Sequence, residues 1–288
     1  MSWISFLAAQ SLNALSQASI LFFIASGLTL IFGIMRIVNF AHGALFMLGA
    51  YIGYSVALRT SFWLALIVAP VAVALVGVAA ERFLLSRLYH RDGGAFLMVT
   101  FGMAVVLAQA VRGMWGPSPL PLALPDALSD IVLIGDQPFP IYRVFLIGLG
   151  LAVALGLWQF LERTRAGLLI RGVAQNAEMV HALGTNVGLV RTGVFALGCG
   201  VAALGGVLAA PLVTAFLGMG ATVIIDAFVI VIIGGMGSFL GSIIGSVLVG
   251  FVQVFGSYYF PNLAMAVMYL LMLGILVLRP GGLLGKEE

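Results

Sequence analysis

Charged side chains are scarce in this sequence: Asp, Glu, Lys and Arg together make up 8% of its 288 residues. Soluble domains carry roughly 25% of these residue types, so water is not the main solvent of this chain. Hydrophobic residues make up 62%, and apolar runs of about 20 residues, each long enough to cross a bilayer as a helix, recur from end to end. The short alternating segments of a membrane β-barrel are missing. The sequence therefore predicts an all-α, polytopic transmembrane helical bundle.

Catalytic and metal-binding signatures are also missing. A single cysteine, Cys199, excludes an internal disulfide and a cysteine-based metal cluster, and its place between two glycines in an apolar run indicates a small packing residue. No GxxxxGK[ST] phosphate loop, HExxH zinc motif or GxSxG elbow occurs, and the three histidines lie far apart. We therefore expect no catalytic residue, no metal and no cofactor here, and any ATP hydrolysis on a separate polypeptide.

Nine apolar stretches are candidate membrane spans. One of them, 223–236, is too short to cross a bilayer alone as a regular helix, so it is interpreted as a half-helix or re-entrant piece. The expected bundle thus has about 8–10 helices, some of them broken or re-entrant. The stretches are 13–35, 40–58, 62–80, 95–111, 141–161, 192–217, 223–236, 240–259 and 263–278.

The arginines predict which loops face the cytoplasm. Segments 81–93 and 162–191 are rich in arginine, whereas 112–140 carries three aspartates and six prolines. Because cytoplasmic loops carry an excess of Lys and Arg, the first two segments are expected inside and the third outside. Arg279 and Lys286 place the C-terminus in the cytoplasm, and nine crossings place the N-terminus outside. The net charge of +3 reflects these loops and does not indicate nucleic-acid binding.

The arginine-rich segment 162–191 contains a predicted amphipathic helix, whose apolar face carries Val173, Ala177 and Val180 and which ends at a suitable C-cap, Gly184. Such a helix either lies among lipid headgroups or docks a partner. Docking to a partner is favoured because the chain has no ATP-hydrolysing motif of its own. The residues expected to form this coupling helix are Arg171, Gln175, Ala177, Glu178, Val180, Leu183 and Gly184.

A glycine-rich stretch near the C-terminus, GGMGSFLGSIIGSVLVG, holds two successive GxxxG units formed by Gly237, Gly241 and Gly245. Small residues at this spacing let helix backbones approach closely in lipid, so helix packing is one interpretation. The other is a broken helix whose freed backbone groups line a translocation path. Asp226, shortly before, is either a solvated helix end or a polar group at the mouth of that path. The glycines expected along the path are Gly234, Gly235 and Gly237.

Three polar residues, Arg36, Asn39 and His42, interrupt the apolar stretch GLTLIFGIMRIVNFAHGALFMLGAY. A charge at mid-bilayer costs at least ~2.5 kcal/mol, so Arg36 is expected near the cytoplasmic surface, followed by a turn with Asn39 near the next N-cap. His42 is expected either to pack in the first turn of the next span or, with Asn39, to line a path. The polar or glycine-rich breaks at 33–43 and 234–245 hint at internal duplication.

Four stretches, in this order, resemble the permease subunits of branched-chain amino acid ATP-binding cassette importers, the LivH-like family. They are Gly27 to Tyr51, the segment 163–186 with its Leu-Gly-x-Asn ending, the glycine-rich stretch 234–250, and PGGLLG at 280–285. The resemblance implies a single permease domain, 1–288, in the bacterial inner membrane, with a cytoplasmic coupling loop at 162–191.

The resemblance also implies partners and a substrate class. The partners would be a second permease subunit, two cytoplasmic ATP-binding cassette ATPases and a periplasmic substrate-binding protein. The substrate would be a branched-chain or related amino acid, and related permeases for urea, amides, aromatic acids or sugars are alternatives. Asp226 stands where the family often has a basic residue, and Ser242 and Ser246 where Ala and Gly are common. An ion-coupled secondary transporter is a further alternative, but it would need buried carboxylates, and only Asp226 lies near a span interior.

Overall fold

The computed structural model describes residues 3–89, 91, 93–135 and 137–285. Lys286 and one of the three aspartates of segment 112–140, Asp136, lie outside these residues. The elements in chain order are α1 Trp3–Met35, α2 Ala41–Arg59, α3 Phe62–Phe83, the 3-10 helix η1 Leu85–Leu88, α4 Gly93–Trp115, the 3-10 helix η2 Asp126–Leu128, β1 Ile131–Ile134, β2 Gln137–Pro140, α5 Ile141–Arg163, α6 Arg165–Gln175, α7 Ala177–Ala182, α8 Val187–Val213, α9 Met219–Gly234, α10 Phe239–Tyr259 and α11 Ala264–Leu278.

The predicted polytopic helical bundle is confirmed. Over the residues described, seven helices are long and apolar enough to cross a membrane: α1 to α5, α8 and α10. Each of the nine predicted stretches falls on one helix, with α9 and α11 as the two shorter apolar helices. α9 has 16 residues and therefore a length of about 24 Å, short of the ~30 Å hydrocarbon core. It is the short piece expected at 223–236.

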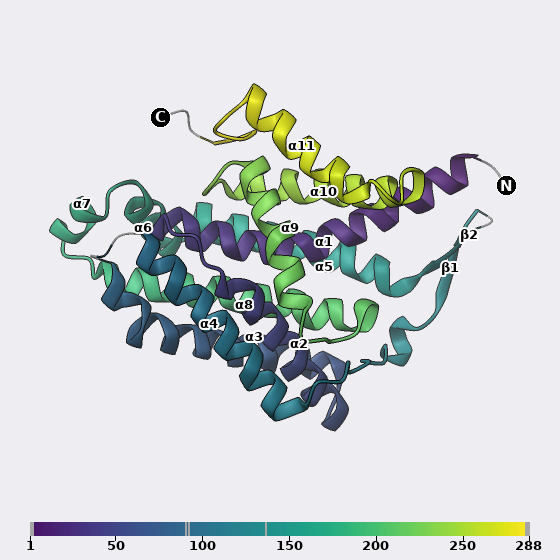
Figure 1. Ribbon diagram of the computed structural model, residues 1–288, viewed down its shortest axis with the longest axis horizontal. Coiled ribbons are helices and arrows are strands. Elements are labelled where there is room, and N and C mark those ends of the chain that lie inside the picture. The colour runs from purple at the N-terminus through teal and green to yellow at the C-terminus, as the bar shows by residue number, and fades with distance from the viewer. Residues whose placement is uncertain (1–2, 90, 92, 136, 286–288) are drawn as a thin grey trace.

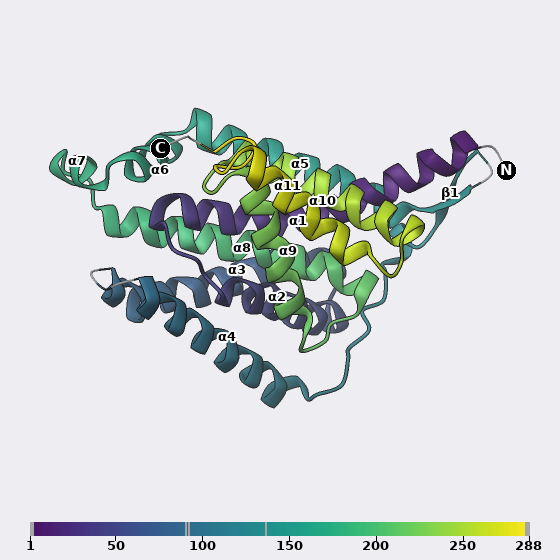
Figure 2. The ribbon, with the colours of Figure 1, turned by 45° about the horizontal axis from the view of Figure 1, so that its top comes forward.

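The bundle has two different ends (Figure 1). One carries α6 and α7, on the left of Figure 1, and is called here the α6–α7 end. The other carries the start of α1 and the antiparallel hairpin of β1 and β2, and is called the hairpin end. Most long helices run between the two ends, whereas α9 runs across their direction (Figures 1 and 2).

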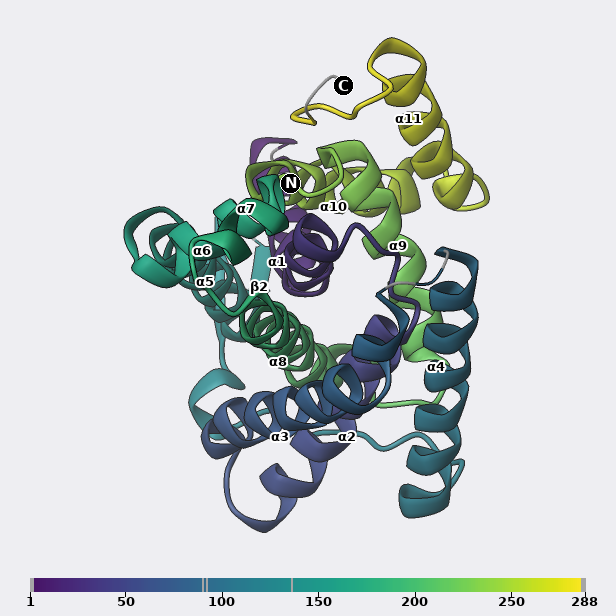
Figure 3. The same cartoon turned by 90° about the vertical axis from the view of Figure 1, so that its left-hand side faces the viewer.

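Helix α8 packs closely against both α1 and α2 in the bundle, which Figure 3 shows end-on. Gly27 on α1 faces Gly198 on α8 so closely that a Cβ on Gly27 would lie 2.5 Å from the Gly198 carbonyl oxygen. A Cβ on Gly206 of α8 would overlap the Phe46 carbonyl oxygen of α2. Small residues are therefore what allows these three backbones to approach, as is common between helices in lipid.

Helices α3, α4 and α5 turn apolar side chains outward. Leu75 on α3, Val106 on α4 and Leu151 on α5 are each more than half exposed. Soluble monomers rarely expose apolar surface over such a large area, and lipid tails solvate it well. The outer surface of the bundle thus agrees with a position in the membrane.

Candidate functional site

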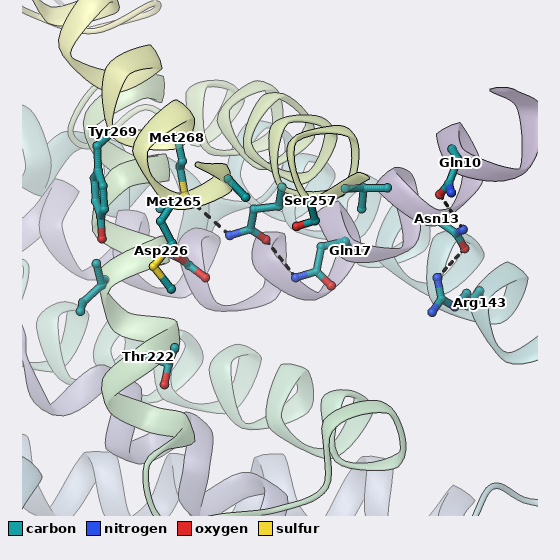
Figure 4. Close-up of a pocket in the computed structure, with 14 residues that line it drawn as sticks. Gln10, Asn13, Gln17, Arg143, Thr222, Asp226, Ser257, Met265, Met268 and Tyr269 are labelled. Atoms are coloured by element: carbon teal, nitrogen blue, oxygen red, sulfur yellow. Dashed lines mark hydrogen bonds between the residues drawn. The ribbon is translucent and has the colours of Figure 1, made fainter. Parts of the chain in front are cut away.

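A pocket of about 600 Å³ opens among α1, α5, α9, α10 and α11. It takes residues from the first half of α1, the first turn of α5 and the last turns of α10, so it lies toward the hairpin end (Figures 1 and 4). Its polar lining consists mainly of amide and ionic side chains on four of these helices. They are Gln10, Asn13, Gln17, Arg143, Asp226 and Gln253.

Three amides on α1 form one side of the pocket. Gln10, Asn13 and Gln17 are spaced by three and four residues, which places them on one face of a helix. Asn13 Nδ2 donates to Gln10 Oε1 over 3.1 Å. Gln17 Nε2 donates to Oε1 of Gln253 on α10 over 3.1 Å, and Gln253 Nε2 in turn faces the Met268 sulfur at 3.6 Å. The amides thus connect α1, α10 and α11 across the pocket.

Two side chains of opposite charge line the same pocket. Arg143, in the first turn of α5, donates to Asn13 Oδ1, and Asp226, on α9, faces the amide of Gln253. Figure 4 shows Asp226 and Arg143 on opposite sides of Gln17. Both are half-buried. The pocket therefore holds one anion and one cation, separated by amides.

The remaining wall is apolar and adaptable. Ile225, Val254, Met265 and Met268 line it beside the amides. Methionine side chains are flexible and polarisable and adjust to differently shaped partners. Together, the two kinds of wall can accommodate a small solute with a polar part and an aliphatic part. Among the residues described, no group of three His, Cys, Asp or Glu side chains could hold a metal ion.

The structure places Asn39 and His42 away from this pocket and deeper than expected. His42 is fully buried, with Nε2 3.1 Å from the Ile24 carbonyl oxygen in the middle of α1. The segment after Arg36 is thus not a shallow turn at the surface, because it leads back into the bundle before α2 begins. The N-cap is Phe40, although the Asn39 side chain still accepts a hydrogen bond from the Ala41 N–H over 3.1 Å.

The glycines of the α9–α10 break lie near the α6–α7 end, also outside the pocket. Gly235 and Gly237 have φ of 100° and 85° and form the turn between the helices. The chain's own C-terminal segment covers this turn, because Leu283 N–H donates to the Ile233 carbonyl and Leu284 N–H to the Gly234 carbonyl, over 2.8 and 3.1 Å. The freed backbone groups at the end of α9 are thus satisfied internally.

The helix packing in this stretch is divided between α10 and the turn. A Cβ on Gly241 would overlap the Gly234 carbonyl oxygen, and one on Gly245 would lie 2.7 Å from the Ile230 carbonyl oxygen. Both residues therefore bring α10 against α9. Gly237, in the turn, lies instead against Gly33 near the end of α1.

The coupling segment forms two helices where the sequence suggested one. α6 begins at Arg165, and the chain breaks at Asn176, whose side chain caps α7 by accepting from the Met179 N–H over 2.9 Å. Asparagine favours such caps over helix interiors, which explains the break. The C-cap of α7 is Leu183, one residue before the Gly184 expected there, and Gly184 follows it in the left-handed conformation at φ 84°. Arg171 forms an ion pair with Glu162 at the end of α5.

Fold and pocket together define a multi-pass membrane protein with a site of solute size, which is the class of membrane permeases. The chain belongs to the family described as branched-chain amino acid transport system / permease component, whose sequence profile matches residues 10–276. The permease protein BraD of Pseudomonas aeruginosa is 28% identical, over 97% of this chain and 96% of BraD. LivH of Escherichia coli K12 is 27% identical, with the same two coverages. A probable LivH of Methanocaldococcus jannaschii is 23% identical, over 96% and 91%.

Sequence reasoning singled out Asp226 but missed five of the six amide and ionic side chains of the pocket. A signal for Gln10, Asn13 and Gln17 was available, because three amides recur at helical spacing just before an apolar run. Arg143 and Gln253 gave no such signal. Each is an isolated polar residue in its own span, and only the packing of α5 and α10 against α1 brings them into the pocket.

Proposed function

We propose that this chain is one of two permease subunits that form the translocation path of an ATP-binding cassette importer for branched-chain or related amino acids. Two separate cytoplasmic ATPases drive the cycle, and a periplasmic binding protein delivers the substrate. The complex resides in the bacterial inner membrane. Family membership supports the class of importer, and the names of the relatives, which are branched-chain amino acid permease proteins, support the substrate class.

The pocket is the observation that carries the proposal. Hydrogen bonds between amides also stabilise helix packing in lipid, but packing alone does not account for an anion and a cation that line one open pocket without pairing. A permease gains from such a pocket, because amides and charges can replace water around a polar solute for the short time of its passage. Asp226, on the transverse helix α9, is the innermost charge of this path.

The distribution of charge supports an orientation with the α6–α7 end in the cytoplasm. Loops with many arginines stay in the cytoplasm, and both arginine-rich connections of this chain lie at the α6–α7 end. The pocket then opens in the periplasmic half of the membrane, where a binding protein delivers its ligand. The described arginines at the cytoplasmic end are Arg36, Arg82, Arg87, Arg91, Arg163, Arg165, Arg171, Arg191 and Arg279.

Helices α6 and α7 form the docking surface for the ATPases in this proposal. Leu168 on α6, Met179 on α7 and the following residue Leu183 are each at least 60% exposed, and they project from the end of the bundle where lipid does not cover them. α5 leads into α6, and α8 follows α7. A push on the docking surface therefore reaches both helices, and α5 carries Arg143 in its first turn, beside the pocket.

Uptake by the assembled complex tests the function. Vesicles containing this chain, its partner permease and the ATPases, supplied with loaded binding protein, should accumulate radiolabelled leucine only with internal ATP. The double substitution Met179→Glu and Leu183→Glu should abolish uptake and copurification of the ATPases. The matched control Leu133→Glu, at an exposed leucine of β1, should leave copurification intact.

Three outcomes would count against these assignments. Unchanged uptake and ATPase association in the double variant would remove the docking surface. Leucine uptake by this chain alone, driven by an ion gradient and independent of ATP, would replace the importer with a secondary transporter. Failure of every branched-chain amino acid to enter with ATP would leave the family assignment but remove the substrate class.

A further inference from the structure

Two opposite charges share the pocket without pairing. Arg143 donates to a neutral amide oxygen, that of Asn13, and Asp226 faces the neutral amide of Gln253. Over the described part of the chain, the one ion pair within 4 Å joins Arg171 and Glu162, far from the pocket. Neither pocket charge therefore has a described counter-ion in the protein.

Keeping the charges of Arg143 and Asp226 apart costs free energy, so their separation indicates a role other than stability. Arg143 and Asp226 are both half-buried, and a charge taken partly out of water is less well stabilised unless an opposite charge lies beside it. Instead, the hydrogen bond between Gln17 and Gln253 lies between them (Figure 4). The pocket is therefore neutral overall but polarised, with its cation toward the hairpin end and its anion further in.

A polarised neutral pocket discriminates solutes by charge. A net cation is repelled at Arg143 and a net anion at Asp226, because charges in a half-buried pocket interact more strongly than charges in bulk water. A solute that carries both charges finds a partner for each as it moves inward. The donors of Arg143 match a carboxylate, and the acceptor oxygens of Asp226 match an ammonium group.

We infer that the pocket selects zwitterionic α-amino acids, whose carboxylate contacts Arg143 and whose ammonium group then contacts Asp226. The inference rests on the proposed function and deepens it. The wall of Ile225, Met265 and Met268 takes the aliphatic side chain, while the amides bridge the interval between the charges. Urea and simple amides, which lack both charges, and carboxylic acids without an ammonium group are disfavoured.

The single, buried cysteine of the chain provides a direct assay of the pocket. Cys199 is fully buried, so the substitution Ser257→Cys would introduce the reactive thiol at an exposed position of the pocket lining. In the reconstituted complex, modification of that thiol by methyl methanethiosulfonate is timed with three ligands of matched skeleton. Leucine carries both charges, 3-methylbutylamine only the ammonium and 4-methylpentanoate only the carboxylate.

Leucine should slow modification of the thiol. Each analogue lacks one charged group, and a hydrogen bond to a charged group contributes more than about 1.4 kcal/mol, so the analogues should need at least about tenfold higher concentrations for the same protection. With Asp226→Asn added, 4-methylpentanoate should protect the thiol at the same concentration as leucine. With Arg143→Gln added, 3-methylbutylamine should protect it at the same concentration as leucine. Asp130→Asn, an exposed carboxylate outside the pocket, should preserve the wild-type order. Tyr258→Cys, adjacent but outside the lining, should show no protection.

Equal protection by all three ligands, or none by leucine, would overturn the inference even if the charge variants fail to fold. The outcome of this protection assay can be distinguished from the outcome of the uptake assay. Uptake of leucine without protection of the pocket thiol would refute the pocket assignment alone. Protection by leucine without ATP-driven uptake would refute the importer function alone.

Discussion

His42, in the first turn of α2, lies against the middle of α1, where its Nε2 is 3.1 Å from the carbonyl oxygen of Ile24. Ile24 precedes the end of α1 at Met35 by eleven residues, a depth of roughly 16 Å along the helix. The five residues 36–40 lead from the end of α1 back to the depth of Ile24, and five extended residues reach about 16 Å. The contact therefore fixes where α2 begins, inside the bundle.

Replacing His42 should destabilise the protein. His42→Ala removes a fully buried ring and its contact with the Ile24 carbonyl, and cavity formation together with a lost buried hydrogen bond costs about 2–4 kcal/mol. His42→Gln keeps an amide donor and should cost less. Thermal unfolding of the purified protein in detergent measures both, with His181→Ala on α7, an exposed histidine, as the neutral control. Equal melting temperatures for the two alanine variants would contradict the structural role.

Gly43→Ala should also lower stability. A Cβ on Gly43 would overlap the Gly220 carbonyl oxygen and lie 2.8 Å from Ile224 Cβ, both on α9. Such overpacking costs typically about 1–3 kcal/mol. Gly148→Ala on α5, where a Cβ meets no atom within 4 Å, is the matched control and should be neutral or slightly stabilising. A lower melting temperature for the α5 variant than for Gly43→Ala would be incompatible with this packing.

The sequence predicted the spans because long apolar runs are a local property. It placed the start of α1 near residue 13, although α1 begins at Trp3, so the expected span included Asn13 and Gln17 but omitted Gln10. The same amides form one side of the pocket. Read for helical spacing as well as for polarity, they would have extended the helix and indicated the pocket together.

Depth in the bundle was not predictable in the same way. A charge followed by an amide after an apolar run is typical of a surface turn, and Arg36 is indeed exposed. Nothing local distinguishes a turn that stays at the surface from one that leads back inward. That choice depends on glycines far along the chain, since Gly198 and Gly220 make room beside Gly27 and Gly43.

The C-terminal segment should stabilise the end of α9. Leu283 and Leu284 donate backbone hydrogen bonds to the Ile233 and Gly234 carbonyls, which belong to the unsatisfied carbonyls at the end of a helix. Deleting residues 281–288 should lower the melting temperature and increase amide hydrogen exchange in α9 and the following turn. Deleting 286–288 keeps both donors and is the control. Unaltered exchange in the longer deletion would show that this contact contributes nothing to stability.

Alkaline pH should weaken the protein through Tyr89, which lies just beyond the membrane-spanning part of α3 and η1. Its hydroxyl donates to Glu81 Oε1 over 2.7 Å, and burial, followed by this hydrogen bond, raises the pKa of Tyr89 above its ordinary 10.0. Above pH 10 the unfolded chain loses the phenol proton while the folded protein keeps it, so stability falls as pH rises. Tyr89→Phe should lower stability by about 1–3 kcal/mol at pH 8, because buried Glu81 loses a donor. Above pH 10, the stability of this variant should fall less steeply than that of the wild type, with a difference in slope of up to about 1.4 kcal/mol per pH unit. Thermal unfolding between pH 8 and 11 compares the two proteins, and parallel pH profiles would refute the role of this hydrogen bond.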